Sequence, residues 1–234
     1  MSLVKSTIEL IESNRISSTE VADALGKKGV VPDLLPINPG RHVAGEIHYV
    51  YAHSESNWPL HEQIQELPEN CFLYVDAFNC NQKAIFGDLV AKYLILYKRV
   101  KGIVVQGHMR DIPDLRKYGF AIWCKGYSPL GCYNNNVVAP EDVKVEAEKR
   151  KAELNGGIMV CDDSGCTVIE KKIINDDTFA RLELIELQED IWSFCINTLK
   201  WNTYDTVCLK KYLTNPDVLP EILREKVKSI PFKQ

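Results

Sequence analysis

The stretch GHMRD, residues 107–111, sets an arginine beside an aspartate directly after the apolar run KGIVVQ. A continuous apolar run of this length is typical of a buried strand, so Arg110 and Asp111 fall where that strand ends. An arginine can donate hydrogen bonds to an oxyanion, and an aspartate can hold a divalent cation. The pair is therefore either two halves of one site or a local ion pair that anchors a loop.

A second candidate, Asp88, lies in FGDLVAKYLILYKRV, residues 86–100. Apolar residues in this stretch share one helical face, which predicts a helix with Asp88 as its N-cap. The amides of Leu89, Val90 and Ala91 would then be first-turn donors without helical partners, which suit a carboxylate or a phosphate. Asp88 would repel that anion unless a cation offset it, and the Arg-Asp pair with a bound metal would supply one.

Strand-like and helix-like stretches alternate through most of the chain, which predicts an α/β layered domain. The predicted helices are 2–13, 17–28, 57–67 and 87–100, and the predicted strands are 42–52, 69–78, 101–107, 120–127 and a hairpin within 156–170. Open α/β sheets bind ligands at the carboxyl ends of neighbouring strands, so we expect the Asp88 and Arg110 loops to meet. The alternative is that Asp88 is only a helix cap.

The composition argues against a nucleic-acid-binding, membrane or secreted protein. A net charge of -4 gives no electrostatic footprint for nucleic acid or an anionic membrane, and no apolar run is long enough to span a bilayer. The polar, amphipathic N-terminus does not resemble a signal peptide. Eight cysteines without a CxxC pattern indicate reduced thiols rather than a disulfide framework. We therefore expect a cytoplasmic protein.

The chain is expected to divide into an α/β domain, residues 1–175, and a helical C-terminal extension, residues 176–234. Residues 141–154 are mostly charged or alanine, which indicates a solvated helix or a connector. Apolar residues recur at helical spacing after residue 176, so that surface must pack on the core or on another subunit. We favour the subunit.

The motifs around both candidate loops resemble a known family. GDLVAKYLILYKRVKGIVVQGHMRD is similar to the central signature of the class II 4-hydroxy-4-methyl-2-oxoglutarate/4-carboxy-4-hydroxy-2-oxoadipate aldolases, whose relatives include the regulator of ribonuclease E activity A. CFLYVDAF resembles the strand before the family's Gly-Asp loop, and MVCDDSGCTVIE its closing hairpin. The likeness covers roughly residues 15–170.

The resemblance implies a swivelling β/β/α-type domain assembled into homotrimers or homohexamers, with Mg²⁺ or Mn²⁺ as cofactor. It implies that Asp111 coordinates the metal and that Arg110 contacts the keto oxygen of a pyruvate-like 2-oxo acid. Gly87 and the amides of Leu89 and Val90 would then bind the substrate carboxylate. By the same resemblance, Asp88 orients a metal-bound water.

The implied activity is metal-dependent carbon–carbon cleavage of a 2-oxo acid, by retro-aldol reaction or oxaloacetate-type decarboxylation, through a pyruvate enolate. His108, beside the metal loop, is a candidate acid/base or a substrate contact, and otherwise a surface or supporting residue. The alternatives are a non-catalytic regulator of the ribonuclease-regulator type and a lyase or dehydratase acting on a sugar-derived oxo acid.

The sequence departs from the family in three respects. One residue more than is common lies between Asp88 and Arg110, and the turn around YKRVKG is expected to absorb it. His108 and Met109 stand where small or aliphatic residues are usual, which predicts a narrower or differently functional pocket. The aldolases also use a glutamate from a neighbouring subunit's tail, and no residue beyond about 175 can be assigned that role.

Overall fold

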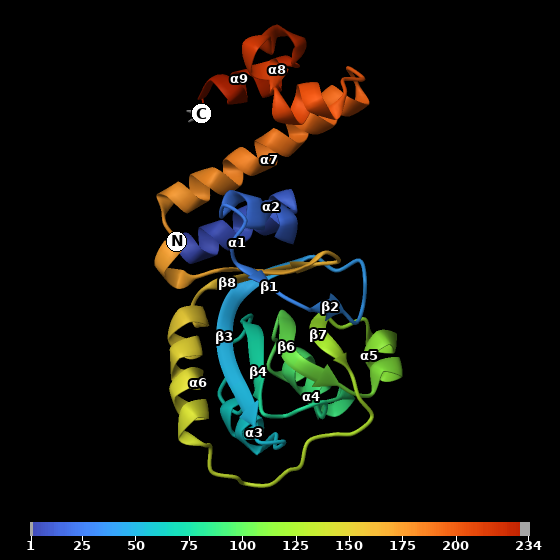
Figure 1. Ribbon diagram of the computed structural model, residues 1–234, viewed down its shortest axis with the longest axis vertical. Coiled ribbons are helices and arrows are strands. Elements are labelled where there is room, and N and C mark those ends of the chain that lie inside the picture. The colour runs from blue at the N-terminus through green and yellow to red at the C-terminus, as the bar shows by residue number, and fades with distance from the viewer. Residues whose placement is uncertain (1, 230–234) are drawn as a thin grey trace.

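The computed structural model describes residues 2–229, which form a layered α/β unit and a helical C-terminal part that projects from it (Figure 1). The helices are α1 (Leu3–Asn14), α2 (Ser18–Ala24), α3 (Trp58–Gln63), α4 (Asp88–Lys92), α5 (Ile112–Tyr118), α6 (Glu141–Leu154), α7 (Asp176–Asn197), α8 (Lys211–Thr214) and α9 (Glu221–Ser229). The strands are β1 (Val30–Val31), β2 (Leu35–Pro36), β3 (Val43–His53), β4 (Phe72–Phe78), β5 (Ala84–Phe86), β6 (Gly102–Met109), β7 (Ile122–Tyr127), β8 (Ile158–Asp162) and β9 (Gly165–Ile169). Within the described residues, no helix is long and apolar enough to cross a membrane.

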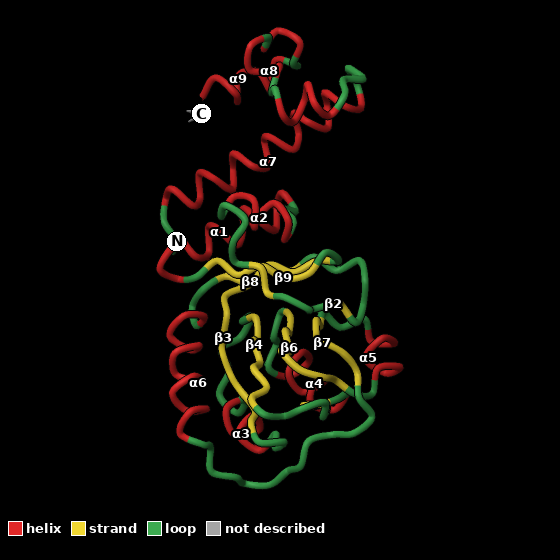
Figure 2. Tube along the Cα trace, viewed as in Figure 1, coloured by secondary structure: helices red, strands yellow, loops and turns green. Residues whose placement is uncertain are grey.

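The long strand β3 joins two differently built parts of one sheet. Its first residues, Val43 to Glu46, pair antiparallel with β8, and residues Ile47 to His53 pair parallel with β4. The parallel part continues through β6 to β7, and the antiparallel part continues through β9 to β1. In Figure 2, β8 and β9 lie across one end of the parallel strands.

The two parts of the sheet pack in layers, because successive side chains of a strand face opposite sides. Met159 of β8 joins the core beneath the parallel strands, whereas Ile158 and Val160 pack against α1, α2 and α7. The other face of the parallel strands is covered by α3 and α5, through Leu60 and Leu115 among others. This arrangement confirms the predicted β/β/α layering and adds an outer layer of helices to it.

The charged stretch after residue 140 is helix α6, which packs against the parallel strands. It buries Val143, Ala147 and Leu154. Its Arg150 donates from Nε to the buried Asp76 of β4 at 3.1 Å and from Nη2 to the Tyr74 hydroxyl at 2.9 Å. The helix is therefore attached by apolar contacts and by one buried ion pair.

The C-terminal helices pack on their own chain. The first half of α7, including Leu182, shares an apolar cluster with Ile11 of α1 and Val21 of α2. The second half forms a separate cluster with Tyr212 and Leu219. The predicted helical extension therefore begins at the start of α7 and covers the N-terminal helices, while its contact with another subunit remains a prediction.

Two local expectations were wrong, and a third stretch holds strands that were not predicted. Residues 29–40, where no strand was expected, contain β1 and β2, which are too short to show a periodic pattern. The strand before Asp88 is the three-residue β5 rather than β4. The second helix ends at Ala24 because Gly26 and Lys27 adopt positive φ angles of 70° and 64°.

One stretch between Asp88 and Arg110 departs from α-helical geometry. Helix α4 continues directly into a π-helical turn at Tyr93–Tyr97, where the Lys98 amide donates to the Tyr93 carbonyl at 3.1 Å. A π turn takes up one residue more than an α turn. It ends at Tyr97, the first residue of the YKRVKG turn, and absorption of the extra residue at this point of the chain stays a prediction.

Arg150→Ala is expected to lower the free energy of unfolding by about 1–3 kcal/mol near neutral pH, because Asp76 then stays buried without its ion pair. Burial raises the pKa of Asp76, and Arg150 opposes that rise. Without Arg150 the folded-state pKa of Asp76 climbs further, so the folded chain takes up the proton more readily than the unfolded chain. The destabilisation should therefore shrink as pH falls through that pKa.

Urea unfolding of both proteins at about pH 7 and about pH 5 measures this difference. Lys149→Ala, which removes an exposed pair with Glu146, is the matched control and should change stability by less than about 0.5 kcal/mol. A deficit that is the same at both pH values would contradict the role given to Asp76.

Candidate active site

The two candidate loops meet because β5 and β6 are parallel neighbours. Phe86 pairs with Met109, and the Arg110 amide donates to the Phe86 carbonyl at 3.2 Å. The chain leaves β5 through Gly87 into α4, and it leaves β6 through Arg110 and Asp111 into α5. Both loops therefore lie at the carboxyl ends of their strands, where open α/β sheets bind ligands.

Gly87 allows Asp111 to approach the backbone of the first loop closely. A Cβ atom on Gly87 would lie 1.9 Å from Oδ2 of Asp111 and 2.9 Å from Cγ of Arg110. The Asp88 amide lies 3.3 Å from the same Oδ2 and donates to it. Any side chain larger than hydrogen at residue 87 would therefore displace the Arg-Asp pair.

The Asp111 carboxylate is not used to cap α5. Asp111 adopts a left-handed conformation, with φ of 58°, and its carbonyl rather than its side chain accepts from the amides of Asp114 and Leu115. Its side chain is 39% exposed, and its Oδ2 lies 3.6 Å from Nε of Arg110. The loop thus presents a carboxylate and a guanidinium side by side in an open position.

A third segment, residues 130–133, closes one side of the site. The Ala84 amide donates to the Leu130 carbonyl at 2.8 Å, and the Cys132 amide donates back to the Ala84 carbonyl at 2.9 Å. Between them, Gly131 leaves room for Arg110, since a Cβ there would lie 2.4 Å from Nη1. This segment forms a wall against which the guanidinium rests.

These elements enclose an open cavity of about 320 Å³. Its lining comprises Asn57, His61, Ala84, Ile85, Phe86, Gly87, Leu89, Val90, Arg110, Asp111, Gly131, Cys132 and Asn134. The predicted Gly87, Leu89, Val90, Arg110 and Asp111 are therefore brought together.

Sequence reasoning missed Asn57, which begins α3 and is 8% exposed. Its Nδ2 donates to the Ile85 carbonyl at 2.9 Å, while its Oδ1 is buried with no hydrogen-bond partner within the described residues. An asparagine before Trp58 and Pro59 signals only a helix start. His61, one turn later, also lines the cavity.

Two predicted residues do not line this cavity. The Asp88 carboxylate accepts from Nζ of Lys92 at 2.7 Å, and Lys92 also lies over the Tyr118 ring. Asp88 is the first residue of α4, whose N-cap is Gly87, so the predicted cap was misplaced by one residue. His108 lies on β6, packed against Gly126 of β7, and its Nδ1 is buried without a hydrogen-bond partner in the described structure.

The donor set fits a largely hydrated Mg²⁺ or Mn²⁺. Such ions are often held by one or two carboxylates, with water and substrate oxygens completing the shell. Asp111 offers one accessible carboxylate beside an open cavity. Among the described residues, no group of three or more His, Cys, Asp or Glu side chains could form a closed metal site of the kind that zinc prefers.

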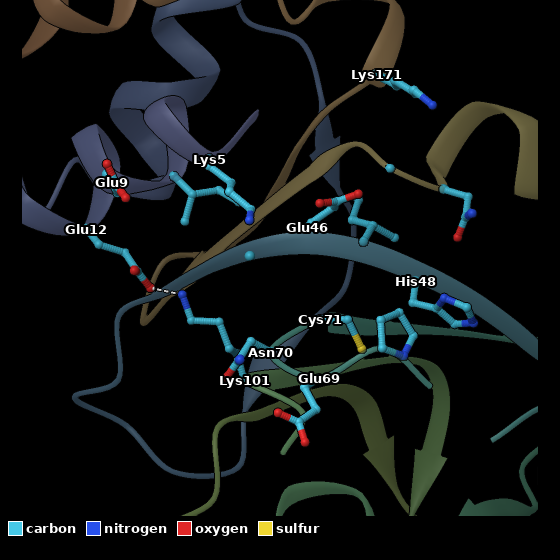
Figure 3. Close-up of a pocket in the computed structure, with 16 residues that line it drawn as sticks. Lys5, Glu9, Glu12, Glu46, His48, Glu69, Asn70, Cys71, Lys101 and Lys171 are labelled. Atoms are coloured by element: carbon cyan, nitrogen blue, oxygen red, sulfur yellow. Dashed lines mark hydrogen bonds and ion pairs between the residues drawn. The ribbon is translucent and has the colours of Figure 1, made fainter. Parts of the chain in front are cut away.

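A larger cavity, of about 550 Å³, lies at the amino ends of the parallel strands, beside α1 (Figure 3). It carries both signs of charge, and its Lys101 pairs with Glu12 at 2.6 Å. Its position is opposite to the strand ends that carry the Arg-Asp pair. We therefore place the candidate active site in the smaller cavity.

Two curated proteins are similar in sequence. Protein DlpA of Legionella pneumophila is 22% identical over 189 residues, which is 74% of this chain and 29% of the Legionella protein. A protein of Halalkalibacterium halodurans named "Putative 4-hydroxy-4-methyl-2-oxoglutarate aldolase" is 29% identical over 166 residues, 67% of this chain and 73% of that protein. The chain thus spans less than a third of the first relative's length.

Solved structures share the fold. An uncharacterized protein from Pseudomonas syringae superposes with a TM-score of 0.63 at 20% identity, covering 83% of this chain and 93% of that one. The RNA-processing inhibitor RraA from Thermus thermophilis superposes with a TM-score of 0.51 at 18% identity, covering 65% and 91%. The RraA-like family, described as Aldolase/RraA, matches residues 18–168, which include both candidate loops and the closing hairpin. This chain belongs to the RraA-like family.

Proposed function

We propose that the protein is a divalent-metal-dependent lyase that cleaves a carbon–carbon bond in a 2-oxo acid. The observation that carries the proposal is the approach of Asp111 and Arg110 to Gly87, which sets an accessible carboxylate and a guanidinium at the edge of one open cavity. The family contains aldolases as well as regulators. One relative of this chain is named as an aldolase, which supports an enzymatic rather than a regulatory function. The fold alone does not decide between them.

In this proposal each group contacts a different part of the substrate. The amides of Leu89 and Val90, in the first turn of α4, donate to the substrate carboxylate. The Arg110 guanidinium donates to the keto oxygen, where negative charge develops as the bond breaks. Asp111 holds the divalent ion, which when bound supplies further positive charge to the same oxygen.

The proposed reaction is balanced without a redox partner. In a 4-hydroxy-2-oxo acid the bond between C3 and C4 breaks, its electron pair stays on C3 as an enolate, and C4 becomes a carbonyl as its hydroxyl loses a proton. In oxaloacetate the bond to the distal carboxylate breaks instead, and carbon dioxide leaves. Both cleavages give the pyruvate enolate, so one site serves both.

Asp111→Ala is expected to lower metal-dependent pyruvate release from oxaloacetate by at least about 10²-fold, because the ion loses its carboxylate and the keto oxygen loses the charge it supplies. Release is measured with Mg²⁺ or Mn²⁺, with EDTA, and against the spontaneous rate without protein. Titration with Mn²⁺ provides a second readout, since binding should be lost in the same variant.

Asp114→Ala is the matched control, because Asp114 is an exposed carboxylate in the first turn of the same helix. It should retain both metal binding and turnover. Equal rates in wild type and Asp111→Ala, or no metal-dependent release from the folded wild type, would overturn the proposal in favour of a binding role.

Gly87→Ala is expected to reduce turnover by about 10²-fold or more without unfolding the protein, because the new Cβ must push Asp111 and Arg110 out of position. Gly126→Ala provides a comparison outside the cavity lining. Its Cβ would meet the His108 ring at 3.1 Å, a contact that a small ring movement relieves. Comparable turnover in both variants would show that turnover does not require the close approach of Asp111 and Arg110 to Gly87.

Asp88→Asn and His108→Ala test the two predicted residues that lie outside the cavity lining. We expect each to lower kcat/KM by less than about tenfold, well short of the loss expected for Asp111→Ala. A larger loss for Asp88→Asn would restore its predicted role in orienting a metal-bound water. Steady-state kinetics of the three variants, at equal metal concentration, makes the comparison.

A further inference from the structure

Two cysteines come together at the wall of the candidate active site. Cys132 lines the cavity and is partly exposed, whereas Cys80, in the turn between β4 and β5, is 1% exposed. The Lys83 amide donates to the Cys80 carbonyl at 3.0 Å, and the Cys132 amide donates to the carbonyl of the next residue, Ala84, at 2.9 Å. These backbone bonds hold the two segments side by side, and Cys132 packs against the same apolar cluster that contains Cys80, where the two thiols interact.

The surroundings distinguish the two thiols. The interaction with Cys80 lowers the pKa of Cys132, and the charges of Lys83 and Arg110 lower it further, whereas burial and the Glu55 carboxylate raise it. The same interaction and burial raise the pKa of Cys80. Cys132 is therefore the more acidic of the two thiols, and it is the one that faces the cavity.

Lys83 is fixed where it favours the Cys132 thiolate. Its Nζ pairs with Glu55 at 2.5 Å and lies 5.3 Å from the centroid of the Tyr133 ring, next to Cys132. Because a thiolate rather than a thiol is the nucleophile, a partly exposed cysteine beside cations is the reactive kind. Its neighbour Cys80 is positioned to resolve the product.

A second cysteine pair in the same chain lacks these features. Cys161 and Cys166 face each other across the β8–β9 hairpin, and both are buried. Burial raises the pKa of Cys161 well above its ordinary value, and no cation among the described residues offsets that rise. This pair serves as an internal control, because its two thiols are neighbours but are buried from solvent and have no described cation beside them.

We propose that Cys132 is an oxidation site for hydroperoxides and that Cys80 is its resolving partner. In the first step the Cys132 sulfur attacks one peroxide oxygen, the O–O bond breaks, and a sulfenic acid and water or an alcohol form. In the second step Cys80 attacks the sulfenic sulfur, water leaves, and a Cys80–Cys132 disulfide forms. The peroxide is reduced by two electrons and the dithiol is oxidised by two.

The disulfide would tie the turn before β5 to the wall segment 130–133 and remove the thiolate from the cavity. Oxidation would therefore alter the wall against which Arg110 rests. The chemistry at the two sulfurs does not depend on the proposed lyase activity. It can therefore be tested by measuring the oxidation state of the two sulfurs directly.

The experiment treats the reduced, full-length protein with a few equivalents of hydrogen peroxide, blocks the remaining thiols after unfolding, and maps disulfides by mass spectrometry. We expect a cross-link between the peptides of Cys80 and Cys132, reversible with dithiothreitol, while Cys161 and Cys166 stay free. Oxidation of the hairpin pair first, or no Cys80–Cys132 cross-link, would overturn the proposal.

Variants separate the two roles. Cys80→Ser should accumulate a sulfenic acid at Cys132 that dimedone traps, and Cys132→Ser should leave Cys80 unoxidised. Thermal unfolding checks that both variants are folded. Dimedone labelling at another cysteine in Cys80→Ser, with Cys132 unlabelled, would contradict the assignment.

The role of Lys83 gives an independent readout. Lys83→Met should move the pH midpoint of Cys132 alkylation upward and slow the reaction near neutral pH about threefold or more. Lys117→Met, at an exposed position on α5, should leave the midpoint unchanged. An unchanged midpoint in Lys83→Met would show that the thiolate does not depend on this charge and would overturn that part of the proposal.

Discussion

The parallel pairing of β5 with β6 is the constraint on which the candidate site depends. One backbone hydrogen bond, from Arg110 to Phe86, sets the two loops in register. Gly87 then lets the Asp111 carboxylate approach to within hydrogen-bonding distance of the Asp88 amide. The rest of the fold holds β6 in place: β4 and β7 flank it, and β3 aligns β4. The core beneath the strands thus determines where a carboxylate and a guanidinium meet.

The described helices outside the RraA-like region, which spans residues 18–168, do not take part in the candidate site and pack in two apolar clusters. The long helix α7 takes part in two apolar clusters, one with α1 and α2 and one with α8 and the segments around it. The second cluster contains no residue of the α/β layers, so it is a small core of its own. Helices α1 and α2 shield the outer face of the β8–β9 hairpin together with α7. The described C-terminal region therefore adds apolar core to the chain and contributes no residue to the lining of the candidate site.

Long elements and several residues of the candidate site could be predicted from the sequence, because periodicity and the ends of apolar runs carry that information. The strand ends at Arg110 and Asp111 and the helix after Gly87 were located in this way. The features that could not be predicted depend on contacts between segments that are distant in the sequence. Nothing local reveals that Asn57 reaches β5 or that residues 130–133 form a wall. The Lys92 partner of Asp88 was visible at i,i+4 spacing and was overlooked. The β5 strand was too short to detect.

The wall segment is attached by its main chain, through bonds between Ala84 and Leu130, Ala84 and Cys132, and Asn57 and Tyr133. Backbone bonds do not depend on which side chains the segment carries, apart from the glycine that accommodates Arg110. The other side chains of the segment can therefore be exchanged without detaching the wall from the core. A chain built this way can change the side chains along one side of the candidate site while the strand ends that carry the Arg-Asp pair stay in place.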